Sequence, residues 1–185
     1  MAAKARGFTL VEMIVVIVIM AIAITGVSVA LFPKSRQSAE QVLAVKAAEL
    51  GRAVMDEILG RKFDQNSGPN GGLPECVLEL TAGRELCTAP QNLGTDGEAS
   101  KSEYDDVDDY SGINGSVFDV LDENLDEISY QGFRVVIDVK YEQDDNGEMS
   151  VIEAEDTITH YKRIEVTIID RQGNHYPFAA TRGNY

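Results

Sequence analysis

The feature that most constrains this chain is an apolar run near its N-terminus. From Phe8 to Phe32 the sequence holds 25 residues and only one charge, Glu12. As a helix the run would span roughly 37 Å, which exceeds the hydrocarbon core of a bilayer at about 30 Å. It is apolar on every side, unlike the amphipathic surface helix of a soluble domain. It therefore predicts a membrane-spanning or membrane-inserted helix.

Charges around the run favour one orientation. Lys4 and Arg6 precede it and Lys34 and Arg36 follow it, so the positive-inside rule alone is nearly balanced. The chain has 31 acidic and 16 basic residues, a formal net charge of −15. A short basic N-terminus that stays inside, followed by a large exported acidic domain, is the simpler prediction. The same balance argues against nucleic-acid binding, which needs a basic face.

A cleaved secretory signal is the alternative for this segment. Such a signal has an apolar core of about 7–15 residues followed by small residues at the cleavage site. Ala21 and Ala23 could imitate that site, but the apolar run continues past them to Leu31. The length of the run favours an anchor that is kept.

The junction before the run carries the most specific pattern in the chain. Gly7 separates the basic leader from the apolar residues, and Glu12 follows five residues later. An unpaired carboxylate in lipid costs several kcal/mol, so it calls for a partner or a proton. The α-amine that cleavage after Gly7 would create is the best candidate, on this chain or on a neighbouring copy.

The sequence from Gly7 to Glu12, with the apolar helix behind it, resembles the type IV filament superfamily of pilins and type II secretion pseudopilins. The resemblance implies cleavage between Gly7 and Phe8 by a prepilin peptidase and N-methylation of Phe8. It also implies that Glu12 pairs with the Phe8 amine of an adjacent subunit during filament assembly.

Looser motifs resemble the minor pilins of mannose-sensitive haemagglutinin pili: Phe32-Pro33, Ala47 to Gly51, Asp56 to Leu59 and Asp105 to Tyr110. A minor pilin implies major and minor pilins, the prepilin peptidase and an inner-membrane assembly platform as partners. It also implies storage in the bacterial inner membrane and then placement in an extracellular pilus. Two alternatives stay open: a minor pseudopilin of type II secretion, and a membrane-tethered adhesin or binding module.

Helical periodicity continues beyond the anchor. Apolar residues recur every three or four positions and predict one buried stripe: Ala39, Leu43, Ala47, Leu50, Val54 and Ile58. We expect a single helix from Phe8 to about Arg61, ended near Gly60 and interrupted at Gly26 and Pro33. The predicted domains are a leader at 1–7, an apolar helix at 8–32, an amphipathic helix at 33–62 and a globular head at 63–185.

Cys76 and Cys87 have ten residues between them in a loop-rich region. In an oxidising compartment they would form a disulfide, which across such a loop contributes about 2–4 kcal/mol. The two histidines, His160 and His175, lie far from both in sequence, so no zinc pattern is present.

Acidic residues form two clusters in the head. The first, a candidate for weak Ca²⁺ binding through carboxylate oxygens, consists of Asp105, Asp106, Asp108 and Asp109. The second consists of Asp122, Glu123, Asp126 and Glu127. Solvated loops, or a contact with a basic patch on another subunit, would explain such clusters equally well. The run from Asp144 to Glu148 could hold Ca²⁺, but it also suits a hairpin turn. No other cofactor is expected.

The last third of the chain predicts antiparallel strands. Apolar residues alternate with polar ones in three stretches, at 133–141, 163–168 and 176–180, separated by turn residues. A sheet with one apolar face, covered by the apolar stripe of the helix, gives an α+β fold. Pilins follow the same plan, so the resemblance implies a pilin-like fold.

No sequence motif of an enzyme stands out. The chain lacks phosphate-binding and dinucleotide-binding glycine motifs, Gly-x-Ser-x-Gly and His-Glu-x-x-His. Paired carboxylates could hydrolyse sugars, but spacing alone does not support this among 31 acidic residues. We therefore expect a structural subunit rather than an enzyme.

Overall fold

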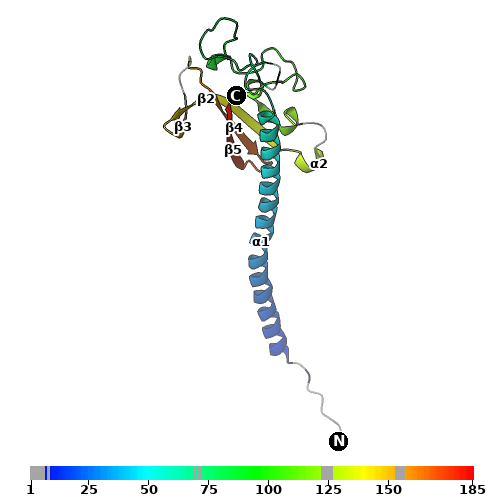
Figure 1. Ribbon diagram of the computed structural model, residues 1–185. Helices are drawn as coiled ribbons and strands as arrows, with labels where there is room; N and C mark the ends of the chain where they lie inside the picture. The colour runs from blue at the N-terminus through cyan, green and yellow to red at the C-terminus, as the bar shows by residue number, and fades with distance from the viewer. Residues whose placement is uncertain (1–6, 8, 69, 71, 122–126, 153–156) are drawn as a thin grey trace. The chain divides into compact units, whose positions relative to one another are not determined.

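The computed structural model describes residues 7, 9–68, 70, 72–121, 127–152 and 157–185, and for residues 29–38 it describes the backbone alone. One long helix and an antiparallel sheet make up most of this structure, which confirms the predicted α+β class (Figure 1). The chain divides into two compact units, which we call the anchor unit (Met1–Leu43) and the head unit (Ala44–Tyr185).

Helix α1 runs from Leu10 to Leu59. Its start is two residues later than predicted, because Thr9 acts as the cap. The Thr9 hydroxyl accepts a hydrogen bond from the Glu12 backbone N–H (3.3 Å), and the Thr9 carbonyl accepts one from Met13 (3.2 Å). Capping by threonine satisfies N–H groups that would otherwise have no partner in the first turn.

The prediction that α1 is interrupted at Gly26 and Pro33 is wrong. The helix is continuous through both residues. Proline lacks one backbone N–H, so it removes one hydrogen bond of the ladder, and the bonds before and after it keep the remaining residues helical. The predicted end is confirmed to within a residue, because the Gly60 N–H still donates to the Asp56 carbonyl before the chain turns away.

The sheet of the head unit is antiparallel throughout, with strand order β1-β2-β4-β5 and β3 paired to the far end of β2. The strands are β1 (Asn114–Ser116), β2 (Arg134–Asp145), β3 (Glu148–Val151), β4 (Tyr161–Ile169) and β5 (His175–Gly183). Short helices lie in the connections: η1 (Pro90–Asn92), η2 (Asp108–Tyr110), η3 (Val117–Asp119) and α2 (Glu127–Tyr130).

The predicted alternation puts the expected residues in the core. Val135, Ile137 and Val139 of β2 are buried and lie opposite Ile168, Val166 and Ile164 of β4, which are buried too. The turn between β2 and β3 is the predicted hairpin. Asn146 and Gly147 both have positive φ, at 60° and 91°, as a two-residue turn with this twist requires.

The last part of α1 supplies the other half of the core. Ala47, Leu50, Val54 and Ile58 are all at most 1% exposed, which confirms the stripe at these positions. Ala39, placed at the start of the predicted stripe, is exposed. Gly51 lies on the same side of α1 and so close to the Phe178 ring of β5 that a Cβ added to it would overlap the ring. The missing side chain lets helix and sheet approach each other.

We predict that Gly51→Val destabilises the head by about 1–3 kcal/mol, the usual cost of overpacking a core. Valine has a higher helix propensity than glycine, so a loss of stability must come from the contact with Phe178. Ala48→Val, at an exposed position three residues earlier, is the control and should change stability by less than about 1 kcal/mol. Thermal unfolding of the full chain in detergent measures both, and equal stabilities of the two variants would contradict the packing described here.

Candidate functional site

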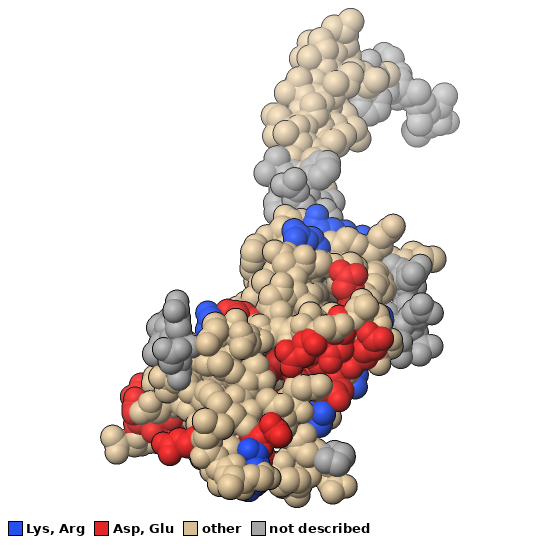
Figure 2. Space-filling model, turned by 90° about the horizontal axis from the view of Figure 1, so that it is seen from above, with Lys and Arg blue, Asp and Glu red and all other residues tan. Residues whose placement is uncertain are grey.

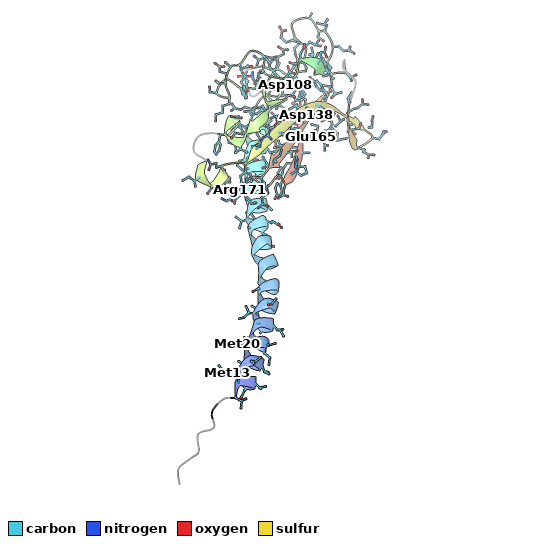
Figure 3. All side chains as sticks on the ribbon, turned by 180° about the vertical axis from the view of Figure 1, so that it is seen from behind. Met13, Met20, Asp108, Asp138, Glu165 and Arg171 are labelled. Atoms are coloured by element: carbon cyan, nitrogen blue, oxygen red, sulfur yellow. A yellow bond between two sulfur atoms is a disulfide. The ribbon has the colours of Figure 1, made fainter. Side chains whose placement is uncertain are left out.

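The first part of α1 is an apolar surface that the described residues leave exposed. The segment Leu10–Ser28 has the length and composition to cross a membrane, and none of it is buried. Its large apolar side chains range from 42% exposed at Val16 to 77% at Leu10. Figure 3 shows Met13 and Met20 projecting from this part of the helix. An exposed apolar surface of this extent indicates contact with lipid or with other proteins.

Glu12 is the only charged residue of this segment. Its carboxylate is exposed in the first turn of α1, and no described residue donates a hydrogen bond to it or pairs with it. A negative charge is favoured at a helix N-terminus by the helix dipole, yet in an apolar environment it still needs a countercharge. The predicted countercharge, the amine of Phe8, lies outside the described residues, and Gly7 is exposed with nothing packed against it.

The head unit carries patches of charged side chains. Figure 2 shows acidic side chains gathered in patches on the visible face of the head, with fewer basic ones between them. The second predicted acidic cluster lies outside the described residues except for Glu127.

The carboxylates of the first acidic cluster have different interaction partners. Asp105 pairs with Lys62 (2.9 Å), and Asp108 pairs with the buried Lys162. Asp106 accepts hydrogen bonds from the backbone N–H groups of Asp108 (2.6 Å) and Asp109. These bonds form because the chain turns tightly there into η2.

Only part of the predicted calcium set converges. The carboxylates of Asp105 and Asp109 lie near that of Glu98, with oxygens within 4.8 Å of one another. Asp109 also accepts hydrogen bonds from the backbone of Asp105 and Asp106. Asp106 and Asp108 are not in this group among the described residues. Calcium binding by the cluster predicted from the sequence stays a prediction.

Burial changes the acidity of this cluster. The pKa of Asp106 is raised to about 7, mainly by desolvation and also by the charge of Asp109, while Lys162 opposes the rise. Asp106 is fully buried, and its second carboxylate oxygen has no hydrogen-bond partner. A proton on that oxygen removes the cost of an unpaired buried charge. Desolvation likewise holds the pKa of Asp108 well above its ordinary value, although Lys162 lowers it.

The sequence analysis did not predict the buried ion pairs that Lys162 forms in the head. This lysine is 0% exposed, and its Nζ donates to Asp64 (2.9 Å), to both oxygens of Asp108 (2.6 and 2.8 Å) and to the Phe63 carbonyl (2.9 Å). A signal was available in the alternation of β4, because Lys162 stands two residues before Ile164 and therefore on the apolar face of the strand.

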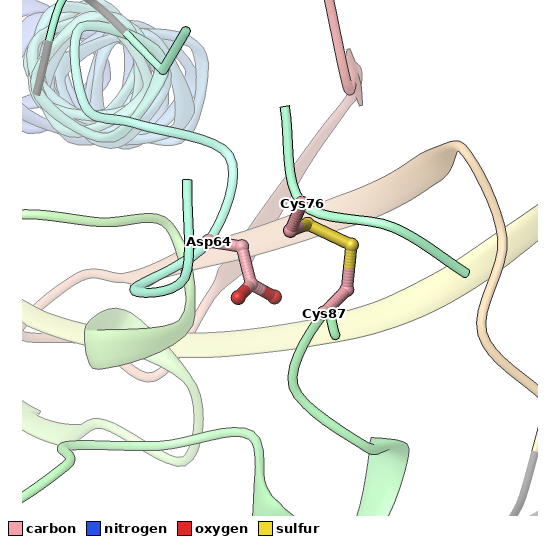
Figure 4. Close-up of side chains that lie close together, drawn as sticks. All are labelled: Asp64, Cys76 and Cys87. Atoms are coloured by element: carbon pink, nitrogen blue, oxygen red, sulfur yellow. A yellow bond between two sulfur atoms is a disulfide. The ribbon is translucent and has the colours of Figure 1, made fainter. Parts of the chain in front are cut away.

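The predicted disulfide between Cys76 and Cys87 is confirmed, and both residues are buried. The Asn184 side chain near the C-terminus donates to the Cys76 carbonyl (3.0 Å) and fastens the loop to the end of β5. Figure 4 shows Asp64 beside the two sulfurs. These three side chains could hold a metal ion by distance alone, but the bridge leaves no thiolate. Asp64 instead accepts hydrogen bonds from Thr88.

The family described as prokaryotic N-terminal methylation motif matches residues 2–28. The match covers Gly7, Phe8, Glu12 and the apolar segment of α1. This motif indicates a type IV pilin-like prepilin. Prepilins with this motif are processed by a prepilin peptidase and assemble into pili with other pilins. The single apolar helix agrees with anchoring in a membrane before assembly. No curated protein and no solved structure matches the chain.

We predict that Asp106 makes the stability of the head depend on pH. The folded protein keeps this proton up to pH about 7, whereas the unfolded chain loses it near 3.8. The free energy of unfolding therefore falls as pH rises from about 4 to 7, by at most about 1.4 kcal/mol per pH unit. Asp106→Asn should flatten this part of the profile.

Denaturant unfolding of the full chain between pH 4 and 8 measures the effect. Asp138→Asn removes a carboxylate that pairs with Lys140 on the surface and serves as the control. If stability fell as steeply with pH in Asp106→Asn as in the original protein, Asp106 would not be the protonated group.

Proposed function

We propose that this chain is a minor pilin, a structural subunit that takes part in the assembly or tip initiation of a type IV pilus. The observation that carries the proposal is the methylation motif at residues 2–28 on an apolar helix that the protein leaves uncovered. A single protein with this surface needs lipid around it, whereas a bundle of such helices buries the same surface against itself.

Processing comes first in the proposed sequence of events. The prepilin peptidase cuts between Gly7 and Phe8, removes the basic leader and leaves an α-amine on Phe8, which is then methylated. The cut places a positive charge four residues before Glu12. Because the leader is gone, this amine lies at the start of the apolar segment.

Assembly then pairs charges between copies. The helix is held in the inner membrane until an assembly platform extracts it into the growing fibre. There the apolar segments pack together, and the Glu12 carboxylate of one subunit forms an ion pair with the Phe8 amine of its neighbour. A buried charge left unpaired costs several kcal/mol, so the pair sets the axial position at which each subunit is accepted. The disulfide-bridged head then lies on the exterior or at the tip of the fibre.

We also propose the type of pilus. The motifs at Phe32-Pro33, Ala47 to Gly51, Asp56 to Leu59 and Asp105 to Tyr110 favour the D-type minor pilin of mannose-sensitive haemagglutinin pili. Such a role would connect the chain to cell adhesion. A minor pseudopilin of type II secretion is the second candidate, because the same leader, cleavage site and helix serve both systems. Deletion of the gene separates them: a pilus subunit affects surface fibres and attachment, and a pseudopilin affects export of folded proteins.

We predict that Glu12→Gln lowers the amount of the protein in sheared extracellular fibres at least tenfold, the effect of losing about 1.4 kcal/mol or more of pairing energy. Glutamine is similar in size but carries no charge, so the helix and the head should stay intact. Quantitative immunoblotting of sheared fibres and membranes measures the distribution. Glu40→Gln, which removes an exposed carboxylate of α1 outside the apolar segment, is the control and should enter fibres normally.

Mass spectrometry of the N-terminal peptide from both variants provides the processing control. It should start at N-methylated Phe8, so that a loss of Glu12→Gln from fibres is not caused by an uncut leader. Normal incorporation of Glu12→Gln would remove the charge pair from the mechanism. Absence of the unmodified protein from sheared fibres would instead favour a membrane-tethered binding module that works without assembly.

A further inference from the structure

The amine of Lys162 lies beside the carboxyl groups of Asp64 and Asp108 in a site that is closed to water. Lys162, Asp64 and Asp108 are each at most 1% exposed. They come from β4, from the loop after α1 and from η2, respectively, so the folded head brings together three distant parts of the sequence. Figure 3 places Asp108 within the head.

Aromatic side chains close the site on the sides that the carboxylates leave open. Lys162 Nζ lies 4.3 Å from the centre of the Phe63 ring and 5.2 Å from that of Tyr141. Both aromatic residues are buried in the same apolar cluster as the disulfide. Low polarity around an ion pair raises the cost of keeping both groups charged.

The charges in the site do not balance when all groups are ionised. One ammonium faces the carboxylates of Asp64 and Asp108, and the charge of Asp106 acts on the same site. A proton on Asp108 leaves Lys162 and Asp64 as a neutral pair, which is the arrangement that burial favours. Asp108 is then a carboxylic acid beside an amine whose proton has a nearby acceptor.

The contact between Lys162 and Asp108 is suited to bond formation. Nζ lies 2.6 Å from one oxygen and 2.8 Å from the other, so it contacts both oxygens of the carboxyl group at Cγ. The Asp64 oxygen lies 2.9 Å from the same nitrogen, within reach of its proton. Contacts of this kind hold the two reacting groups close together, which lowers the entropic cost of bringing them into position.

We propose that Lys162 and Asp108 react within the folded head to form an amide bond between Nζ and Cγ, with Asp64 as the proton acceptor. This modification is separate from the role in a filament and does not depend on it.

The reaction balances without any other reagent. Asp64 takes one proton from the Lys162 ammonium, and the freed lone pair attacks Cγ of the Asp108 acid. The Nζ–Cγ bond forms, the bond from Cγ to the hydroxyl oxygen breaks, and that oxygen leaves as water with a second proton from Nζ. No group is oxidised or reduced. An ammonium and a carboxylate become an amide and a carboxylic acid, so no charge of this pair is left in the core.

The bond would tie the middle of the head to its sheet. It would join η2 to β4 across a sequence separation of 54 residues, next to the loop that the disulfide already closes. The two cross-links would each restrict a segment that follows α1 when the head is heated.

Intact-mass spectrometry of the purified, full-length processed protein tests the proposal directly. After reduction of the disulfide, the mass should be one water lower than the sequence requires. Proteolysis should yield a branched peptide that joins Lys162 to Asp108. The exposed pair Lys140–Asp138, with a similar distance of 2.8 Å, is an internal control in the same sample and should give only linear peptides.

Two variants test the roles of the residues. Asp108→Ala removes the acid, and Asp64→Asn keeps the size of the side chain but removes the proton acceptor. Both should show the full unreacted mass, with the disulfide and circular dichroism as evidence of folding. A wild-type protein that is folded and has the full mass would overturn the proposal and leave Lys162 as a buried ion pair. A bond that still forms in Asp64→Asn would overturn the role of Asp64.

Discussion

One helix of this protein has to satisfy two different surroundings, and the rest of the structure follows from that constraint. From Leu10 to Ser28, α1 is apolar on all sides and none of it is buried. From Ala47 to Ile58 it has one apolar side, which packs into the core of the head. The two parts of α1 therefore need different surroundings, and an apolar environment around the first part requires a countercharge for Glu12.

The head unit is held together by contacts between segments that lie far apart in the sequence. Gly51 lets α1 approach β5 closely, and Asn184 fastens the disulfide loop to the end of the same strand. The buried contacts of Lys162 connect the segment after α1 with η2 and β4.

Local patterns predicted most of the architecture. The strands follow from alternation, the hairpin from Asn146-Gly147, and the end of α1 from Gly60. The disulfide follows from two cysteines in an exported domain. Local patterns failed where a tertiary contact decides the outcome. Pro33 predicted an interruption that the neighbouring hydrogen bonds overcome. Of the acidic run, only Asp105 and Asp109 lie in one carboxylate group, and its third member, Glu98, comes from outside the run. Lys162 was missed because its partners lie 54 and 98 residues away in sequence.

The most direct test of the account asks what covers the first part of α1. A photoactivatable residue at position 17, where Ile17 is 62% exposed, would be irradiated in cells that make the filament. We expect lipid adducts in the membrane fraction and adducts to another pilin subunit in sheared extracellular fibres. The account would be contradicted if fibres contained the protein without subunit adducts, or if the protein gave lipid adducts alone and never left the membrane.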